Sequence, residues 1–167
     1  QKAPKAWQSY SVNQKADAIY NFTKESLQKL KDANVHVGMV QIGNETGYGF
    51  VGCKTYAAEG YQTVSFSDIA KMMNAGSRAV REIDSNILVA VHNTNPENGY
   101  TYIAQDYYNN GVDYDVFASS YYPYWHGTLS NLTNELRNIA NTYNKKVMVA
   151  ETSYLYTSED GDGHHNT

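Results

Sequence analysis

The chain has 167 residues, of which 41% are hydrophobic and 18% are charged, and its net charge is −4. This length gives room for one modest domain, and the composition is that of a globular protein rather than a disordered chain. The acidic balance and the lack of a basic cluster argue against nucleic acid as a partner. No apolar run approaches the roughly 20 residues that span a bilayer, so we expect no membrane partner.

The first residue is Gln1, and neither an initiator methionine nor a signal peptide is present, so we expect the chain to start inside a larger precursor or to be cut from one. Its single cysteine, Cys53, cannot form an internal disulfide and is interpreted as a free small residue. Tyrosine is the compositional outlier, with 16 residues against 2 Trp and 4 Phe. Tyrosines in loops suit a sugar, because the ring stacks while the hydroxyl hydrogen-bonds.

The first half of the chain predicts a helix, a strand, a long loop and a second helix. Apolar residues at helical spacing predict the first helix over 13–33. A β-branched apolar run predicts a strand over 35–43, and 46–65 has no period and many Gly and Tyr, which indicates a loop. Ser67 is expected to cap a helix that runs to about Glu82.

The second half continues the alternation of strands and helices. A strand is predicted over 87–91 and ends at His92, and a short helix is predicted over 100–110. A further strand, helix and strand follow at 115–120, 129–143 and 147–150. This order predicts an α/β fold of parallel strands joined by right-handed crossovers.

Two architectures fit this alternation, a segment of a (β/α)8 barrel and a doubly wound open sheet. A complete barrel takes about 250 residues, so four strands make only part of one. A doubly wound sheet usually has a glycine-rich phosphate-binding turn after its first strand. Here the turn at 43–47 places the carboxylate of Glu45 where a phosphate would sit, which favours the barrel segment.

Two glutamates end predicted strands, Glu45 after the first and Glu151 after the last. In a β/α barrel the chemistry lies at the carboxyl ends of the strands, and hydrolysis of a glycosidic bond needs two carboxyl groups. Asn44 precedes Glu45, and an amide there can bind a sugar 2-hydroxyl while the acid meets the glycosidic oxygen. The alternative is two ordinary surface glutamates at strand ends.

Motifs along nearly the whole chain carry a family resemblance, and they lie at 40–46, 75–81, 84–96, 117–128, 147–154 and 159–164. In these motifs the chain resembles glycoside hydrolase family 53, the arabinogalactan endo-β-1,4-galactanases, and it is similar to the bacterial type. The resemblance implies a partial catalytic (β/α)8 domain over 1–167, from about the fourth strand through the seventh. Strands one to three and the eighth unit are then expected outside this chain.

The resemblance implies that Glu45 is the acid/base and Glu151 the nucleophile of a retaining mechanism. The two carboxyl groups are then expected roughly 5–5.5 Å apart, as in retaining enzymes. It also implies secretion and a polysaccharide substrate, β-1,4-galactan of pectin. Two other interpretations remain open, a non-catalytic sugar-binding barrel and a hydrolase of the same clan that acts on another β-linked glycan.

Substrate contacts are expected from polar and aromatic residues near the strand ends. His92 is either a hydrogen-bonded core histidine or, as the resemblance favours, a cleft residue that contacts substrate or a catalytic carboxylate. Tyr121 and Tyr122 point in opposite directions if the strand continues, so we expect one of them to face the cleft. The resemblance implies a tyrosine at this strand that orients the nucleophile by a hydrogen bond, and we expect it to be Tyr121. Trp125 is either a stacking platform for galactose or a residue that packs the loop. The full set comprises Asn44, His92, Tyr121, Tyr122, Trp125 and His126.

The tail places oxygen ligands at every second residue, with glycines between them, and two interpretations are open. Ca²⁺ takes carboxylates and carbonyls in this way, whereas short Asp-Gly runs are also common solvated turns. The resemblance implies a structural Ca²⁺ held by Asp160, Asp162, the carbonyl of His164 and Asn166.

Half a barrel has two unpaired parallel edges and an uncovered inner face, which invite aggregation or self-pairing. We therefore expect the remainder of the same barrel as a partner, and we expect the 167-residue piece alone to be inactive.

Overall fold

The structure is a computed structural model that describes residues 2–155, 157, 159 and 163, and a four-stranded sheet forms its frame. The sheet has the order β1 (Met39–Ile42), β5 (Leu88–Asn93), β6 (Val116–Ser120) and β7 (Lys146–Glu151). Every neighbouring pair is parallel, which confirms the topology that the alternation predicts. The first strand is shorter than predicted, because residues 35–38 form no strand.

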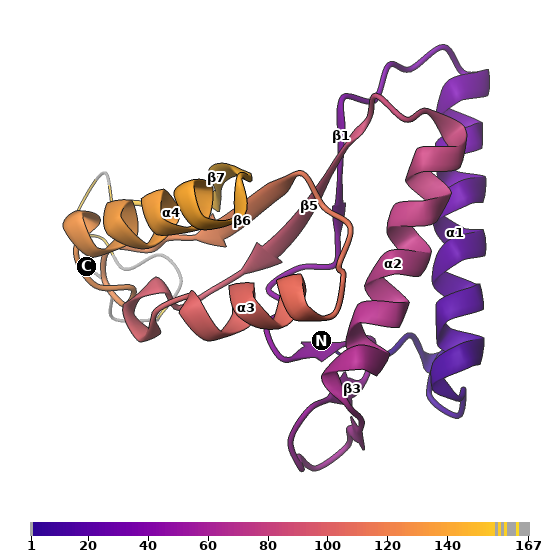
Figure 1. Cartoon of the computed structure of the whole chain (residues 1–167), viewed down its shortest axis with the longest axis horizontal. Coiled ribbons are helices and arrows are strands. Elements are labelled where there is room, and N and C mark those ends of the chain that lie inside the picture. The colour runs from indigo at the N-terminus through magenta and orange to yellow at the C-terminus, as the bar shows by residue number, and fades with distance from the viewer. Residues whose placement is uncertain (1, 156, 158, 160–162, 164–167) are drawn as a thin grey trace.

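Four helices accompany the sheet, namely α1 (Val12–Asp32), α2 (Phe66–Ile83), α3 (Thr101–Asn109) and α4 (Leu129–Tyr143). Each prediction of a helix is confirmed within one or two residues at its ends. The helices α1 and α2 pack side by side at the β1 end, whereas α3 and α4 lie toward β6 and β7 (Figure 1). Short 3-10 turns occur at Lys5–Trp7 and Pro96–Asn98.

The second helix begins earlier than its predicted cap. Ser65, not Ser67, is the N-cap of α2, and its hydroxyl accepts the backbone N–H of Asp68. The Asp68 side chain accepts the Ser65 N–H in return, which completes a capping box. The prediction of Ser67 was wrong because two serines lie near the helix start and only one has Asp at the third following position.

The predicted loop over 46–65 is in fact a small sheet. It contains β2 (Gly49–Phe50), β3 (Cys53–Lys54) and β4 (Gln62–Thr63), each only two residues long. Strands of two residues show no alternation, so their sequence has no period to detect. Cys53 is a free cysteine, as predicted. The structure shows in addition that it is fully buried, with its Sγ 3.2 Å from Nζ of the buried Lys15.

The core lies between the helices and the sheet. One face of α2 is buried, and at Gly76 this helix lies close to Ile42 of β1 and Ile19 of α1. Strand β5 is itself buried along almost its whole length. Aromatic residues extend the core, since the rings of Tyr107 and Phe117 lie 6.3 Å apart and both are fully buried. By contrast, Phe22 on the apolar side of α1 is 64% exposed and lines an open apolar groove along β1.

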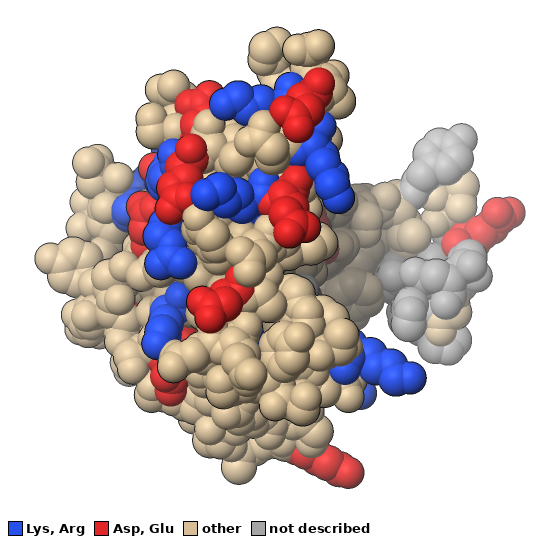
Figure 2. Space-filling view, turned by 90° about the vertical axis from the view of Figure 1, so that its right-hand side faces the viewer, with Lys and Arg blue, Asp and Glu red and all other residues tan. Residues whose placement is uncertain are grey.

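Charges on the side of the molecule formed by α1 and α2 alternate in sign. Figure 2 shows lysines and arginines interspersed with acidic residues there, without a patch of one sign. One such pair is Lys24 with Glu82, whose Nζ and Oε2 atoms lie 2.8 Å apart. None of the described helices is long and apolar enough to cross a membrane.

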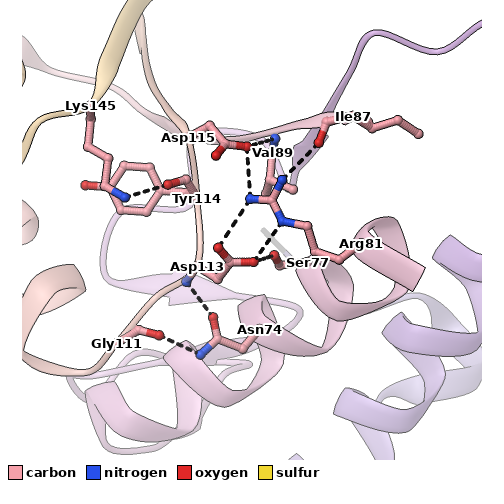
Figure 3. A network of polar contacts seen from close by, with 10 residues as sticks. All are labelled: Asn74, Ser77, Arg81, Ile87, Val89, Gly111, Asp113, Tyr114, Asp115 and Lys145. Atoms are coloured by element: carbon pink, nitrogen blue, oxygen red, sulfur yellow. Dashed lines mark hydrogen bonds and ion pairs between the residues drawn. The ribbon is translucent and has the colours of Figure 1, made fainter. Parts of the chain in front are cut away.

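A polar network ties α2 to the amino ends of β5 and β6 (Figure 3). The guanidinium of Arg81 contacts Asp113 at 3.2 Å and Asp115 at 2.9 Å, and it donates to the carbonyl of Ile87 at 3.0 Å. Asp115 also accepts the backbone N–H of Val89 at 2.8 Å. Each carboxylate here is therefore matched by a cation or a backbone donor.

Asp113 illustrates the electrostatics of this network. Burial alone would raise the pKa of Asp113, but hydrogen bonds from Arg81 and Ser77 outweigh it and hold the pKa below its usual value. The hydrogen bond with Asp113 raises the pKa of Arg81 in turn. Opposite charges and hydrogen bonds thus stabilise both ionised groups.

Candidate active site

Glu45 lies in the turn that follows β1, in a backbone conformation that is rare for residues with a side chain. Its φ is 46°, in the left-handed region, which persists only when surrounding contacts hold it. Those contacts come from Thr46, whose N–H and Oγ1 donate to the carbonyl of His92 at 2.8 and 3.1 Å. The turn is thereby fixed to the end of β5, and the Glu45 carboxylate is directed toward β6, where Ser120 donates to Oε1 at 2.7 Å.

Glu151 is the last residue of β7, and an irregular register sets its position. Ser119 pairs with Val149 but Ser120 pairs with Glu151, so Ala150 is one extra residue in β7. Such a bulge changes the direction of the side chains that follow it. The Glu151 side chain is 36% exposed. Its Oε2 accepts the hydroxyl of Tyr122 at 3.0 Å.

His92 lies between the two glutamates and is completely buried. Its Nε2 is 2.9 Å from Oγ of Ser120, and its Nδ1 is 3.8 Å from Oε1 of Glu151. Burial lowers the pKa of His92, although both glutamates act to raise it. The imidazole is therefore neutral near pH 7, and the two carboxylates share a neighbour that does not cancel their charge.

Among the residues that the structure describes, the two glutamates lack the counter-ion that is found at the opposite end of the sheet. Within the described part of the chain, neither Glu45 nor Glu151 has a lysine or arginine ion-pair partner. Two carboxyl groups around one neutral imidazole, without a paired cation among the described residues, form an arrangement of the kind that clusters at functional sites.

The structure brings Asn44 and Tyr122 into this cluster. Oδ1 of Asn44 lies 3.1 Å from Nδ1 of His92, and Tyr122 contacts Glu151 directly. The expectation that Tyr121 orients the nucleophile is wrong, because Tyr121 is buried and its hydroxyl donates to the carbonyl of Gly127 at 3.0 Å. Adjacent residues point to opposite sides, so only one of the two tyrosines can face the glutamates.

The other two predicted contacts lie further along the same loop. His126 is buried, and its Nδ1 accepts the backbone N–H of Tyr122 at 3.1 Å, so it holds that tyrosine in place. Trp125 is 51% exposed, and its ring lies 5.9 Å from that of Tyr122. An exposed indole beside the cluster is available for stacking on a sugar.

Two parts of the site lie outside the set of predicted site residues. Ser120 connects Glu45 with His92, and its place at the end of β6 is a signal that the strand-end rule already contained. The second part is a cleft of about 400 Å³ beside Glu45, walled by the small sheet and by the segment after β5. The cleft is rich in tyrosine and amide side chains, among them Tyr48, Tyr56, Tyr61, Asn95, Asn98 and Tyr102.

The predicted Ca²⁺ ligands Asp160, Asp162, His164 and Asn166 lie outside the described residues. Among the residues that the structure does describe, no group of three or more His, Cys, Asp or Glu side chains is placed to hold a metal ion.

A parallel α/β sheet with two glutamates at its carboxyl edge is the arrangement expected of a β/α-barrel enzyme with a site at its strand ends. The sequence model described as Glycosyl hydrolase family 53 matches residues 1–167, and the chain belongs to this family.

Relatives of known name agree with this assignment. The chain is 56% identical over 169 residues to an endo-beta-1,4-galactanase of Bacillus subtilis (strain 168), across 100% of the chain and 37% of the relative. It is 32% identical over 165 residues to an arabinogalactan endo-beta-1,4-galactanase of Cellvibrio japonicus, across 95% and 43%. The chain thus spans less than half the length of these relatives.

A solved structure confirms the fold. The GH53 catalytic domain of Ignisphaera aggregans superposes with a TM-score of 0.84 at 34% identity, across 98% of the chain and 44% of that domain. The fold is therefore α/β with a parallel sheet and corresponds to part of a (β/α)8 barrel, as predicted. The numbering of its strands as the fourth to seventh stays a prediction.

Proposed function

We propose that the protein to which this chain belongs is a retaining glycoside hydrolase that cleaves internal β-1,4-galactosidic bonds of pectic (arabino)galactan. The observation that carries the proposal is the pair Glu45 and Glu151, held at the carboxyl edge of one sheet around a neutral His92. The printed activities of relatives in the same family support the choice of substrate.

In the proposed mechanism Glu45 protonates the glycosidic oxygen while Glu151 attacks the anomeric carbon. The bond to the leaving sugar breaks, and a covalent glycosyl-enzyme forms on Glu151. Glu45 then takes a proton from water, whose oxygen attacks the anomeric carbon and releases Glu151. The separation of roughly 5–5.5 Å between the carboxyl groups stays a prediction of this mechanism.

The hydrogen bond from Tyr122 suits the role of Glu151 in this cycle. It holds Oε2 in place, while Oε1 lies 3.8 Å from Nδ1 of His92. The same contact raises the pKa of Tyr122, which keeps the phenol protonated as a donor. A nucleophile fixed by one hydrogen bond loses less entropy on reaching the attack geometry.

The cleft beside Glu45 provides room for further sugar units and supports action within a chain. Its walls combine tyrosine rings with amides, which match the apolar faces and hydroxyl groups of galactose. Lys54 lies 4.3 Å from the ring centre of Tyr61 and 4.9 Å from that of Tyr56, which orders both rings at the cleft.

We also propose a structural Ca²⁺ bound by Asp160, Asp162, His164 and Asn166, and an extracellular location. Carboxylate and carbonyl oxygens with intervening glycines support the ion, and a polymeric substrate supports secretion. Removal of Ca²⁺ with a chelator should lower the melting temperature of the full-length protein, and Ca²⁺ but not Mg²⁺ should restore it. A melting temperature that the chelator leaves unchanged would contradict the proposal of a structural Ca²⁺.

The proposed function is tested by hydrolysis of linear β-1,4-galactan with the full-length protein, wild type beside Glu151→Gln. We expect fragments of mixed length from the wild type and a loss of rate of about 10⁴-fold or more in the variant. Hydrolysis of a different β-glycan instead would contradict the substrate. Binding without hydrolysis by both proteins would indicate a sugar-binding barrel.

A further inference from the structure

Ser120 makes a bridge that the roles of the two glutamates do not require. It is the last residue of β6 and is fully buried. Its Oγ lies 2.7 Å from Oε1 of Glu45 and 2.9 Å from Nε2 of His92. A buried hydroxyl with two such neighbours has a fixed hydrogen-bond direction, because it carries only one proton.

The direction follows from the count of protons. The carboxylate of Glu45 can only accept, so the hydroxyl of Ser120 donates to it. The second contact of that oxygen must then be an N–H donor, which places the proton of neutral His92 on Nε2. Nδ1 is left as an acceptor, and the backbone N–H of Glu45 donates to it at 3.4 Å. The side-chain amide of Asn44 also lies 3.1 Å from Nδ1, so in this arrangement it presents its NH2 group and not its oxygen to the ring. The chain of donors therefore runs from His92 through Ser120 to Glu45.

The surroundings keep this direction constant. Burial lowers the pKa of His92 and thereby disfavours the doubly protonated ring. In that form Nδ1 would be a donor instead of an acceptor. The other titratable groups whose charge acts on this cluster are Glu151 from β7, Tyr122 from the loop after β6, and Tyr100 before α3. Both phenols have a raised pKa and stay neutral, so within the described part of the chain the charges at this cluster that change during the cycle are those of Glu45 and Glu151.

We propose that Ser120 and His92 are positioning residues that keep Oε1 of Glu45 hydrogen-bonded throughout the reaction, so that Oε2 alone carries the catalytic proton. This inference rests on the proposed function of Glu45 as acid/base. The carbonyl oxygen of the protonated acid and the oxygen of the carboxylate both accept from Ser120. The hydrogen bond from Ser120 to Oε1 is therefore present in both steps. Oε2, the oxygen that carries the proton, keeps the same position in each step.

The value of such a clamp is geometric. An acid/base must donate toward the leaving oxygen in one step and accept from a water at that point in the next. Free rotation of the carboxyl group would place the proton on either oxygen and spread the productive geometry over several orientations. The positive φ of Glu45 and the bridge through Ser120 fix the group from its backbone and from its tip.

The test compares Ser120→Ala with Ser119→Ala in the full-length protein. Ser119 is the neighbouring, equally buried serine, but its Oγ contacts the hydroxyl of Tyr100 at 2.5 Å and not the glutamates. A hydrogen bond to a charged group is worth enough that Ser120→Ala should lower kcat on galactan by about tenfold or more. The loss of a donor to the carboxylate should also move the basic limb of the pH–rate profile to higher pH.

The leaving group separates positioning from a general structural role. With an aryl β-galactobioside whose nitrophenol departs without protonation, the loss of kcat/KM in Ser120→Ala should shrink to about twofold, because kcat/KM reports the first step and that step then needs little acid catalysis. Ser120→Thr, which keeps the hydroxyl, should restore most of the rate. Circular dichroism of each variant shows whether the protein is folded.

Two results would overturn the inference while the proposed function stands. One is galactan hydrolysis by the wild type with equal losses for Ser120→Ala and Ser119→Ala at every pH. The other is a loss of kcat/KM in Ser120→Ala that is the same for galactan and for the aryl substrate. If the wild type and Ser120→Ala both fail to cleave any β-galactoside, it is the proposed function that fails.

Discussion

The two ends of the same parallel sheet carry polar networks of opposite design. At the amino ends of β5 and β6, Arg81 lies between Asp113 and Asp115, so charges of opposite sign are paired. At the carboxyl ends, Glu45 and Glu151 face a neutral His92 and have no cation beside them among the described residues. In the first network every charged group has a partner within the network. In the second, the carboxyl groups lack a cationic partner among the described residues and are available to interact with a substrate.

The difference teaches which end serves stability and which serves chemistry. Paired charges with a backbone donor stabilise the ionised forms and lock α2 onto the sheet. The carboxyl groups at the other end have no such partners among the described residues, and arrangements of this kind cluster at functional sites. The positive φ of Glu45 is a backbone conformation that is likewise costly and is typical of such sites.

The largest expected effect breaks the amino-end network. Arg81→Met leaves two carboxylates without their partner, and we expect a loss of about 2 kcal/mol, or about 30-fold in the folding equilibrium. Because the folded-state pKa of Asp113 lies below its unfolded value, this stabilisation is present above the unfolded pKa and disappears as pH falls through the folded pKa.

Chemical denaturation at several pH values measures this effect, with activity as the control. Arg81→Met should lower the denaturation midpoint most near neutral pH and leave the shape of the pH–rate profile unchanged. A changed profile with an unchanged midpoint would contradict the division of labour between the two ends.

A smaller effect is expected at the carboxyl end from Tyr122→Phe. This change removes the hydroxyl that donates to Oε2 of Glu151 at 3.0 Å, and kcat should fall by about tenfold. The acidic limb of the pH–rate profile should move to higher pH, because the ionised nucleophile loses a donor. Steady-state kinetics across pH measure both changes.

Tyr121→Phe is the matched control for that variant. The hydroxyl of Tyr121 contacts the carbonyl of Gly127 on the other side of the strand end, so its loss should affect stability more than the pH–rate profile. Equal profiles for the two variants would show that the contact of Tyr122 with Glu151 has no role in catalysis.

The smallest expected effect lies at the edge of the cleft. Lys54→Met removes the cation that lies over Tyr56 and Tyr61, an interaction worth about 0.5–1 kcal/mol at an exposed site. We expect KM for long galacto-oligosaccharides to rise about threefold with kcat unchanged. If KM changes equally for short substrates that do not reach the cleft, the residue has no role in binding the longer chain.

Much of the frame was predictable from local sequence alone. Helix α4 has the predicted bounds, and the four parallel strands follow from apolar runs between helical periods. Glu45 and Glu151 could be selected because each directly follows such a run, and strand ends meet at one edge of a sheet. The small sheet could not be predicted, because its strands are two residues long.

The sequence by itself therefore determined the alternation of elements, the parallel sheet and the two glutamates at its edge, since these depend on periodicity and on order along the chain. The tertiary structure decided which neighbours meet those glutamates. The bulge at Ala150 sets the direction of the Glu151 side chain. Side chains alternate in direction along the chain beyond β6, and it is Tyr122 rather than Tyr121 that points toward Glu151. The bridge from His92 through Ser120 to Glu45 joins three segments far apart in the sequence, and only packing brings them within hydrogen-bond distance.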